Sequence, residues 1–209
     1  MIKVGYLVEC MVVKAIPDYD SYLTMIPKTG FMPLLPKKYA TRKFRVGDSL
    51  IASVHAINDG RIVLTQKSAQ FYRKLTEFFL SPLIREGRIK VRRAAALRNA
   101  PFVKVSVQGL DDEDPIRISI PYLKDWKQYV EETITLVEYS PDLREYVVNS
   151  LAPAPRDGVR KVILFKELRE ALVLVDPGYL GLFLGKGGLN VALASKLLKI
   201  KIKIEKEEE

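Results

Sequence analysis

Two consecutive stretches of the chain, each of roughly 70 residues, show the same predicted order of helices and strands. In each stretch a helix is followed by two strands, two short helices and a last strand. Apolar residues recur at helical spacing over residues 71–83, whereas basic and apolar side chains alternate over residues 88–94, as in a strand with one buried face. Ser140 is expected to cap the first helix of the second stretch. The repeat predicts two α-β-β-α-α-β units, which we place at residues 69–138 and 139–209.

The first 68 residues follow a different pattern, in which short apolar strands alternate with turns. Val-Gly-Asp at residues 46–48 is a turn sequence, and Asn-Asp-Gly at residues 58–60 is a strong hairpin signal. The expected strands span residues 5–13, 22–26, 31–36, 49–57 and 61–65. Five short strands with these turns are typical of a small Greek-key barrel of the OB type. We therefore expect an α+β multidomain protein, with a five-stranded barrel at residues 1–68 ahead of the two repeated units.

The charge balance indicates the class of partner. The chain has 34 Lys and Arg against 25 Asp and Glu in 209 residues, which gives a formal net charge of +9. Such an excess usually reflects an anionic partner, with nucleic acid first, although a generic basic surface remains the alternative. The chain ends in an acidic tail, which includes Glu205 and residues 207–209. The folded part of the last unit is therefore more basic than its total suggests.

The scarcity of cysteine and histidine excludes several kinds of site. One Cys rules out a disulfide framework and a thiolate zinc site, and one His rules out multi-His metal centres. No apolar run approaches the roughly 20 residues that cross a bilayer, and no signal-peptide pattern opens the chain. We therefore expect a cytoplasmic, non-enzymatic binding protein with no metal, no cofactor and no membrane association.

A glycine-rich loop in the last unit carries the clearest functional signal. Gly185, Lys186, Gly187 and Gly188 lie between two predicted helices, where glycines permit tight turning and close approach of another backbone. Amides at the start of the following helix favour a phosphate, and Lys186 adds a mobile positive charge. This is the physics of the GXXG loop of KH domains, which clamps single-stranded RNA; a plain helix–helix turn is the alternative. Asn190, on the following helix, is expected to hydrogen-bond a base or the loop backbone.

The N-terminal segment resembles an S1 RNA-binding domain. The stretches that carry the resemblance are Gly5-x-Leu7, residues 18–23, 30–33, 46–50 and 60–65. The resemblance implies two RNA-contacting aromatics near the second strand and a basic residue on the last one, which match Tyr19, Tyr22 and Arg61. For the two tyrosines a place in the barrel core is an equal alternative, and for Arg61 an equal alternative is a free side chain in the hairpin. Phe31 is expected in the core. The His often found after the third strand is Pro33 here.

An S1 barrel followed by two type II KH units resembles the RNA-binding core of the NusA family of bacterial transcription factors. The matching stretches are residues 83–89, 114–115, 140–142, 149–154 and 184–194. The resemblance implies binding of single-stranded RNA and a role in transcription elongation, termination and antitermination. It also implies RNA polymerase or other transcription factors as further partners. The alternative is an S1-KH adaptor of an RNA-processing or degradation assembly, such as an exosome-like cap.

Two features depart from the NusA pattern. In the first KH unit the GXXG motif falls on residues 121–124, Pro-Tyr-Leu-Lys, so that unit is expected to bind RNA weakly or not through this loop. Trp126 nearby is expected in a core or an interface rather than stacked on a base. The S1-like segment begins at residue 5, so we expect the polymerase-binding domain that precedes S1 in the family to be absent.

Overall fold

The N-terminal segment forms a closed barrel in this computed structural model, which describes residues 2–98 and 100–207. Its strands lie in the order β1-β2-β3-β5-β4, and β3 pairs with β5 in parallel through Leu34 and Val63. They are β1 (Leu7–Ile16), β2 (Ser21–Met25), β3 (Leu34–Pro36), β4 (Ser49–Asn58) and β5 (Arg61–Thr65). Leu35, Ala52 and Leu64 are fully buried in its core. The predicted OB-like barrel is confirmed.

The first KH unit follows the barrel directly. Its elements are α1 (Ala69–Phe79), α2 (Ser81–Arg85), β6 (Ile89–Ala95), β7 (Phe102–Gly109), α3 (Pro115–Ser119), α4 (Trp126–Tyr129) and β8 (Thr133–Glu138). The Ser68 hydroxyl caps α1 by accepting the N–H of Phe71 at 3.0 Å. Pro82 lies in the first turn of α2, where a missing N–H costs little, and the helical stretch over residues 71–83 is divided there into α1 and α2.

The second KH unit repeats the first. Its elements are α5 (Leu143–Ser150), β9 (Val159–Phe165), β10 (Glu170–Val175), α6 (Leu180–Leu184), α7 (Leu189–Leu198) and β11 (Lys201–Lys206). In both units the first two strands are antiparallel and the last two are parallel, in the same sheet order. The prediction for Ser140 is wrong, because Asp142 caps α5 by accepting the N–H of Arg144 at 2.9 Å. Of the acidic tail, Glu205 lies in β11, and Glu208 and Glu209 lie outside the described residues.

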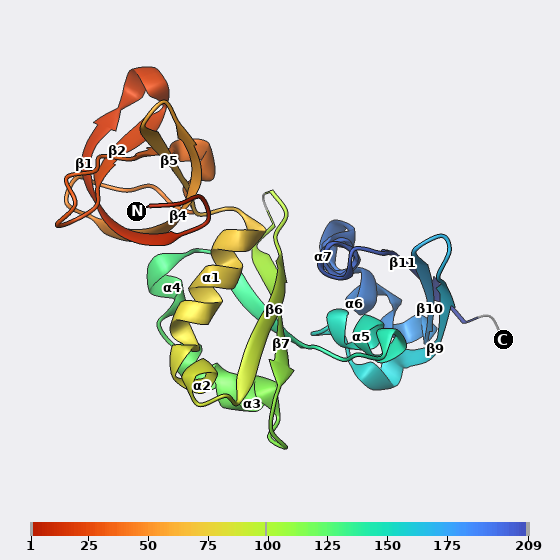
Figure 1. Cartoon of the computed structure of the whole chain (residues 1–209). Coiled ribbons are helices and arrows are strands. Elements are labelled where there is room, and N and C mark those ends of the chain that lie inside the picture. The colour runs from red at the N-terminus through yellow and green to blue at the C-terminus, as the bar shows by residue number, and fades with distance from the viewer. Residues whose placement is uncertain (1, 99, 208–209) are drawn as a thin grey trace.

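Packed side chains join the three parts of the chain. The first KH unit lies between the barrel and the second KH unit (Figure 1). Ala95, Ala100 and Val137 of the first KH unit share one hydrophobic cluster with the core of the second. Ile51 of the barrel packs in a cluster with Phe71 of α1. Within the described ranges, no helix has both the length and the apolar character that a membrane span needs.

Candidate nucleic-acid interface

The glycine-rich loop connects α6 to α7 with a backbone that only glycine adopts easily. The φ angles of Gly185, Gly187 and Gly188 are +71°, +61° and +73°. A Cβ atom at Gly187 or Gly188 would meet no heavy atom within 4 Å, so the outer side of the loop is open. Lys186 is exposed between them. Another backbone can therefore approach this loop closely, as the predicted phosphate contact requires.

Asn190 supports the loop from inside. It is 3% exposed, and its Nδ2 donates to Leu151 O at 2.9 Å and to Phe183 O at 3.0 Å. A side-chain amide committed to two buried carbonyls has no free donor for a base, so of the two predicted partners of Asn190 the base is corrected. The amide does bond backbone, but to carbonyls beside the loop rather than within it. Asn190 instead ties α7 to the end of α6 and to the turn after α5. The sequence did not distinguish these roles, because Asn is common in both.

Gly185 packs directly against Asn190. A Cβ atom built on Gly185 would lie 2.7 Å from Asn190 Cβ, nearer than real side chains approach. We expect Gly185→Ala to lower the free energy of unfolding by about 2 kcal/mol or more, from this clash and the positive φ. Gly181→Ala is the matched control, because Gly181 is helical and a Cβ atom there would meet no heavy atom within 4 Å. The free energy of unfolding of this variant should rise by up to about 1 kcal/mol. Urea unfolding measures both, and equal effects would contradict the packing described here.

The N-terminus of α7 is the natural place for an anion beside the loop. Among the described helices of eight or more residues, α1 and α5 have side-chain caps, whereas α7 begins at Gly188 without one. The amides of Gly188 and Leu189 donate to carbonyls within the loop, so a phosphate would meet the remaining amides and the positive end of the helix dipole. Leu182 on α6 is 57% exposed just before the loop and offers apolar surface for a base.

The corresponding loop of the first KH unit has a different backbone. Residues 120–123 form a short 3-10 helix between α3 and α4, and none of residues 120–124 has a positive φ. Its outer surface carries side chains, with Ile120 60% exposed and Tyr122 37% exposed. Trp126 is 2% exposed, and its Nε1 donates to Glu132 O at 2.8 Å, which confirms its place in a core. Weak RNA binding by this loop remains a prediction.

The three predicted contacts on the barrel have different surroundings. Tyr19 is 75% exposed, and Arg61 is exposed at the start of β5. Tyr22 is 4% exposed, its ring packs edge-on against Phe44, and its hydroxyl accepts the N–H of Phe44 at 3.2 Å. The prediction that Tyr22 stacks on a base is therefore corrected, because its ring fills the barrel core. Phe31, expected in the core, is 48% exposed.

A buried lysine, which was not among the residues predicted from the sequence, joins the two KH units. Lys104 on β7 is fully buried, and its Nζ donates to Ser150 O at 2.6 Å and to Ala152 O, both at the end of α5. Burial lowers the pKa of this ammonium from 10.5 to about 7. The available signal was a charged residue between Val103 and Val105 in an apolar strand. The lysine holds α5 of the second unit against the sheet of the first.

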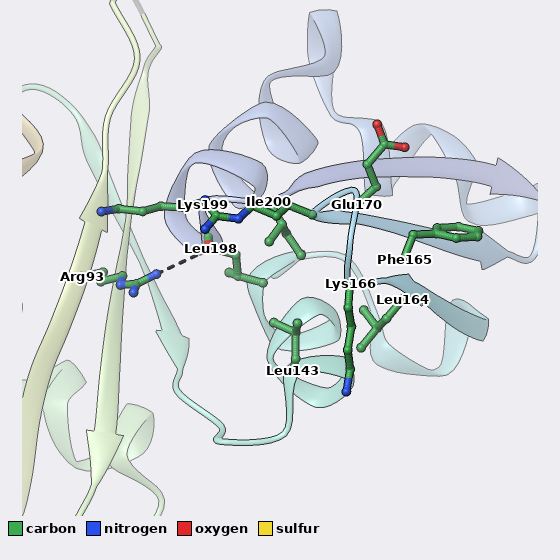
Figure 2. A pocket seen from close by; sticks show the side chains of 10 residues that line it. Arg93, Leu143, Leu164, Phe165, Lys166, Glu170, Leu198, Lys199 and Ile200 are labelled. Carbon is green, nitrogen blue, oxygen red and sulfur yellow. Dashed lines mark hydrogen bonds between the residues drawn. The ribbon is translucent and has the colours of Figure 1, made fainter.

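A hollow at the same junction shows how α7 is anchored. It has a volume of about 340 Å³, and Leu143, Leu198 and Ile200 are among the residues that line it. Figure 2 shows Arg93 of β6 reaching toward the end of α7, where its guanidinium donates to Leu198 O at 3.4 Å. Glu170, also on this hollow, is neutralised by Lys201 and Lys203 of β11. The helix that carries the loop at its N-terminus is thus fixed to the first KH unit at its C-terminus.

Comparison with known proteins agrees with this architecture. Residues 143–209 match the family described as the NusA-like second KH domain. The transcription termination/antitermination protein NusA of Borreliella burgdorferi is 29% identical over 178 residues, which cover 79% of this chain and 36% of that protein. NusA of Thermus thermophilus is 32% identical over 146 residues, which cover 66% of this chain and 37% of that protein. NusA of Halalkalibacterium halodurans is 41% identical over 78 residues, which cover 37% of this chain and 20% of that protein.

The chain therefore spans little more than a third of the length of the curated relatives that it matches most widely. The similarity extends over most of this chain, and the barrel and the two KH units follow one another in the expected order. In its sequence and in the order of its parts, the chain is a NusA-like S1-KH-KH protein.

Proposed function

We propose that the chain binds single-stranded RNA and acts as a transcription elongation, termination and antitermination factor of the NusA type. The observation that carries the proposal is the open loop from Gly185 to Gly188, at the uncapped start of α7 in a NusA-like second KH domain. The transcriptional role rests on the names of the curated relatives, which are transcription termination/antitermination proteins.

The loop supports RNA binding through its backbone rather than through a catalytic group. A phosphate would approach Gly187 and Gly188, where no Cβ intervenes, while Lys186 neutralises part of its charge. The adjoining base would lie against the exposed Leu182 of α6. Such contacts depend on the backbone of RNA more than on its sequence. The first KH unit, with its side-chain-bearing loop, would act mainly as a scaffold that holds α7 in place.

RNA binding by such contacts should weaken strongly as salt is added. For single strands, the logarithm of the binding constant falls by about 0.7 per phosphate neutralised for each unit of log salt concentration. We expect a steep linear decrease between about 50 and 200 mM salt. Fluorescence anisotropy titrations of a labelled RNA at several salt concentrations measure the slope. A slope near zero would contradict phosphate contacts as the main source of affinity.

The transcriptional part of the proposal needs its own test. We propose RNA polymerase as a partner, and purified polymerase should co-elute with the chain or change its pausing and termination when the chain is added. Co-purification with a ribonuclease or a ribosomal particle, without polymerase, would instead favour an adaptor of an RNA-processing assembly. RNA binding with no effect on transcription would contradict the NusA-type role and leave the binding proposal standing.

We also propose that the chain performs no reaction on its RNA. No group of three or more His, Cys, Asp or Glu side chains in the described part of the chain is placed to hold a metal ion. Labelled RNA incubated with the pure chain and divalent ions should remain intact. Products that increase with protein concentration would contradict this expectation.

A further inference from the structure

A second basic hollow lies where the barrel meets both KH units. It has a volume of about 390 Å³, which lies within the range of sites that hold one small ligand. Four basic and two aromatic side chains on its wall matter for its chemistry: Lys38, Tyr39 and His55 from the barrel, Lys67 from the segment before α1, Arg98 from the β6–β7 loop and Lys196 from α7. We call it the junction pocket.

The charge of the junction pocket is one-sided. Its wall, in the part of the chain that the structure describes, contains four cations and no Asp or Glu. Within the same residues, none of the four cations forms an ion pair with a carboxylate. Arg88, by contrast, is paired with Asp111 and Glu113. Cations that converge without a counterion create a positive potential that an anionic occupant would relieve.

One of these cations has a fixed position. Lys196 Nζ donates to Ala96 O at 2.7 Å, which holds the ammonium at the mouth of the β6–β7 loop. Arg98 of that loop is exposed, and Lys67 is half-buried. The three side chains come from three different segments of the chain, and all three line the junction pocket. Lysine and arginine in this arrangement are the residues that bind phosphate oxygens in proteins.

The aromatic side of the pocket adds a second property. The rings of Tyr39 and His55 lie 5.0 Å apart between centroids, tilted by 54°, and the Lys38 ammonium lies 5.1 Å from the centre of the Tyr39 ring. Tyr39 O accepts the N–H of Gln66 at 2.8 Å, which fixes this residue at the end of β5. Aromatic rings beside cations suit a nucleobase attached to a phosphate.

We propose that the junction pocket binds one nucleotide, with its phosphate at Lys67, Arg98 and Lys196 and its base beside Tyr39 and His55. A nucleotide within an RNA strand and a free nucleotide share this chemistry; the first source rests on the proposed function and the second does not. Because the wall is shared by the barrel and both KH units, the occupant bridges all three parts. It therefore stiffens their arrangement as well as adding affinity.

The chain's single histidine makes the test direct. The His55 imidazole signals in an NMR spectrum are unambiguous, and we expect them to shift when single-stranded RNA is added. Adenosine monophosphate forms the second arm: a shift with both ligands means that the pocket accepts a free nucleotide, and a shift with RNA alone means that it takes a nucleotide of a strand. Either result supports the proposal. A shift with poly-glutamate but with neither nucleotide probe would overturn it.

Variants of the pocket residues test whether the His55 shift arises from binding in the junction pocket. Lys67→Glu/Arg98→Glu should abolish the His55 shift and weaken RNA binding about three- to tenfold. The control Lys90→Glu/Arg117→Glu makes the same charge change at exposed sites of the first KH unit, and it should keep the shift. A circular dichroism melt confirms folding, and Tyr39→Ala tests the pocket without a charge change. RNA binding with no His55 shift, or a shift retained in the Lys67→Glu/Arg98→Glu variant, would overturn the pocket and leave the proposed function intact. A His55 shift with adenosine monophosphate but no RNA binding would support the pocket and contradict the proposed function.

Discussion

The Lys186→Asp/Gly187→Asp variant is expected to bind single-stranded RNA at least about tenfold more weakly than the wild type, a loss of about 1.4 kcal/mol or more. Two new carboxylates would repel the phosphate at the start of α7, and a side chain at Gly187 would keep the backbones apart. Both positions are exposed, and a Cβ atom on Gly187 meets no heavy atom within 4 Å, so the change adds no clash. An aspartate at the positive φ of Gly187 costs about 1 kcal/mol of stability, and a circular dichroism melt should show that the variant remains folded. Anisotropy titration at low salt measures the affinity.

A matched control variant separates the effect of changing the loop from the effect of lowering the net charge. Gly87→Asp/Lys90→Asp makes the same changes at an exposed glycine with φ of +73°, also with nothing within 4 Å, and at an exposed lysine nearby on β6. That variant should lose only the modest affinity expected from a lower net charge. Similar losses in both variants would mean that the loop contributes no more than any other basic surface.

The wild-type chain should become more stable, relative to a Lys104→Met variant, as the pH rises from about 7 toward 10. The pKa of Lys104 is lowered by burial from 10.5 to about 7, so in this window the unfolded chain binds a proton that the folded chain does not. Each pH unit then adds about 1.4 kcal/mol to the free energy of unfolding. Below pH 7 both states are protonated and the dependence ends.

Urea unfolding at a series of pH values measures this difference. Burial also raises the pKa of Cys10 to about 11, which lowers stability as the pH rises through 9, but this effect is common to both proteins and cancels. Lys90→Met, at an exposed lysine on the adjacent strand, is the control for the loss of one lysine, measured over the same pH series. Parallel curves for the wild type and Lys104→Met would contradict a lowered pKa at Lys104.

Much of the second KH unit could be predicted from local sequence patterns. Local patterns in the sequence predict a hairpin with strands at residues 159–165 and 170–175, and a glycine-bounded apolar stretch predicts a helix at residues 189–198. Strands β9 and β10 and helix α7 span these same residues. The last strand is shifted by two residues: alternating Lys and Ile predict it over residues 199–204, whereas β11 spans Lys201–Lys206.

The roles of single residues were harder to predict, because burial depends on distant parts of the chain. Tyr22 lies in β2 and Phe31 in the segment that connects β2 to β3, yet the first is buried and the second exposed. Asn190 follows the loop directly, yet its amide bonds Leu151, which is 39 residues away. The junction pocket likewise gathers cations that lie in separate stretches of the sequence. Local periodicity carries no information about such contacts.

Photo-cross-linking tests most directly whether the second KH unit grips RNA. Single-stranded RNA containing 4-thiouridine would be irradiated with the chain, and the cross-linked peptides identified by mass spectrometry. Cross-links should include residues 179–190, which hold α6, the glycine-rich loop and the start of α7, and those in this segment should disappear in the Lys186→Asp/Gly187→Asp variant. Efficient cross-linking with none in this segment, or cross-links confined to residues 120–124 of the first KH unit, would contradict the account.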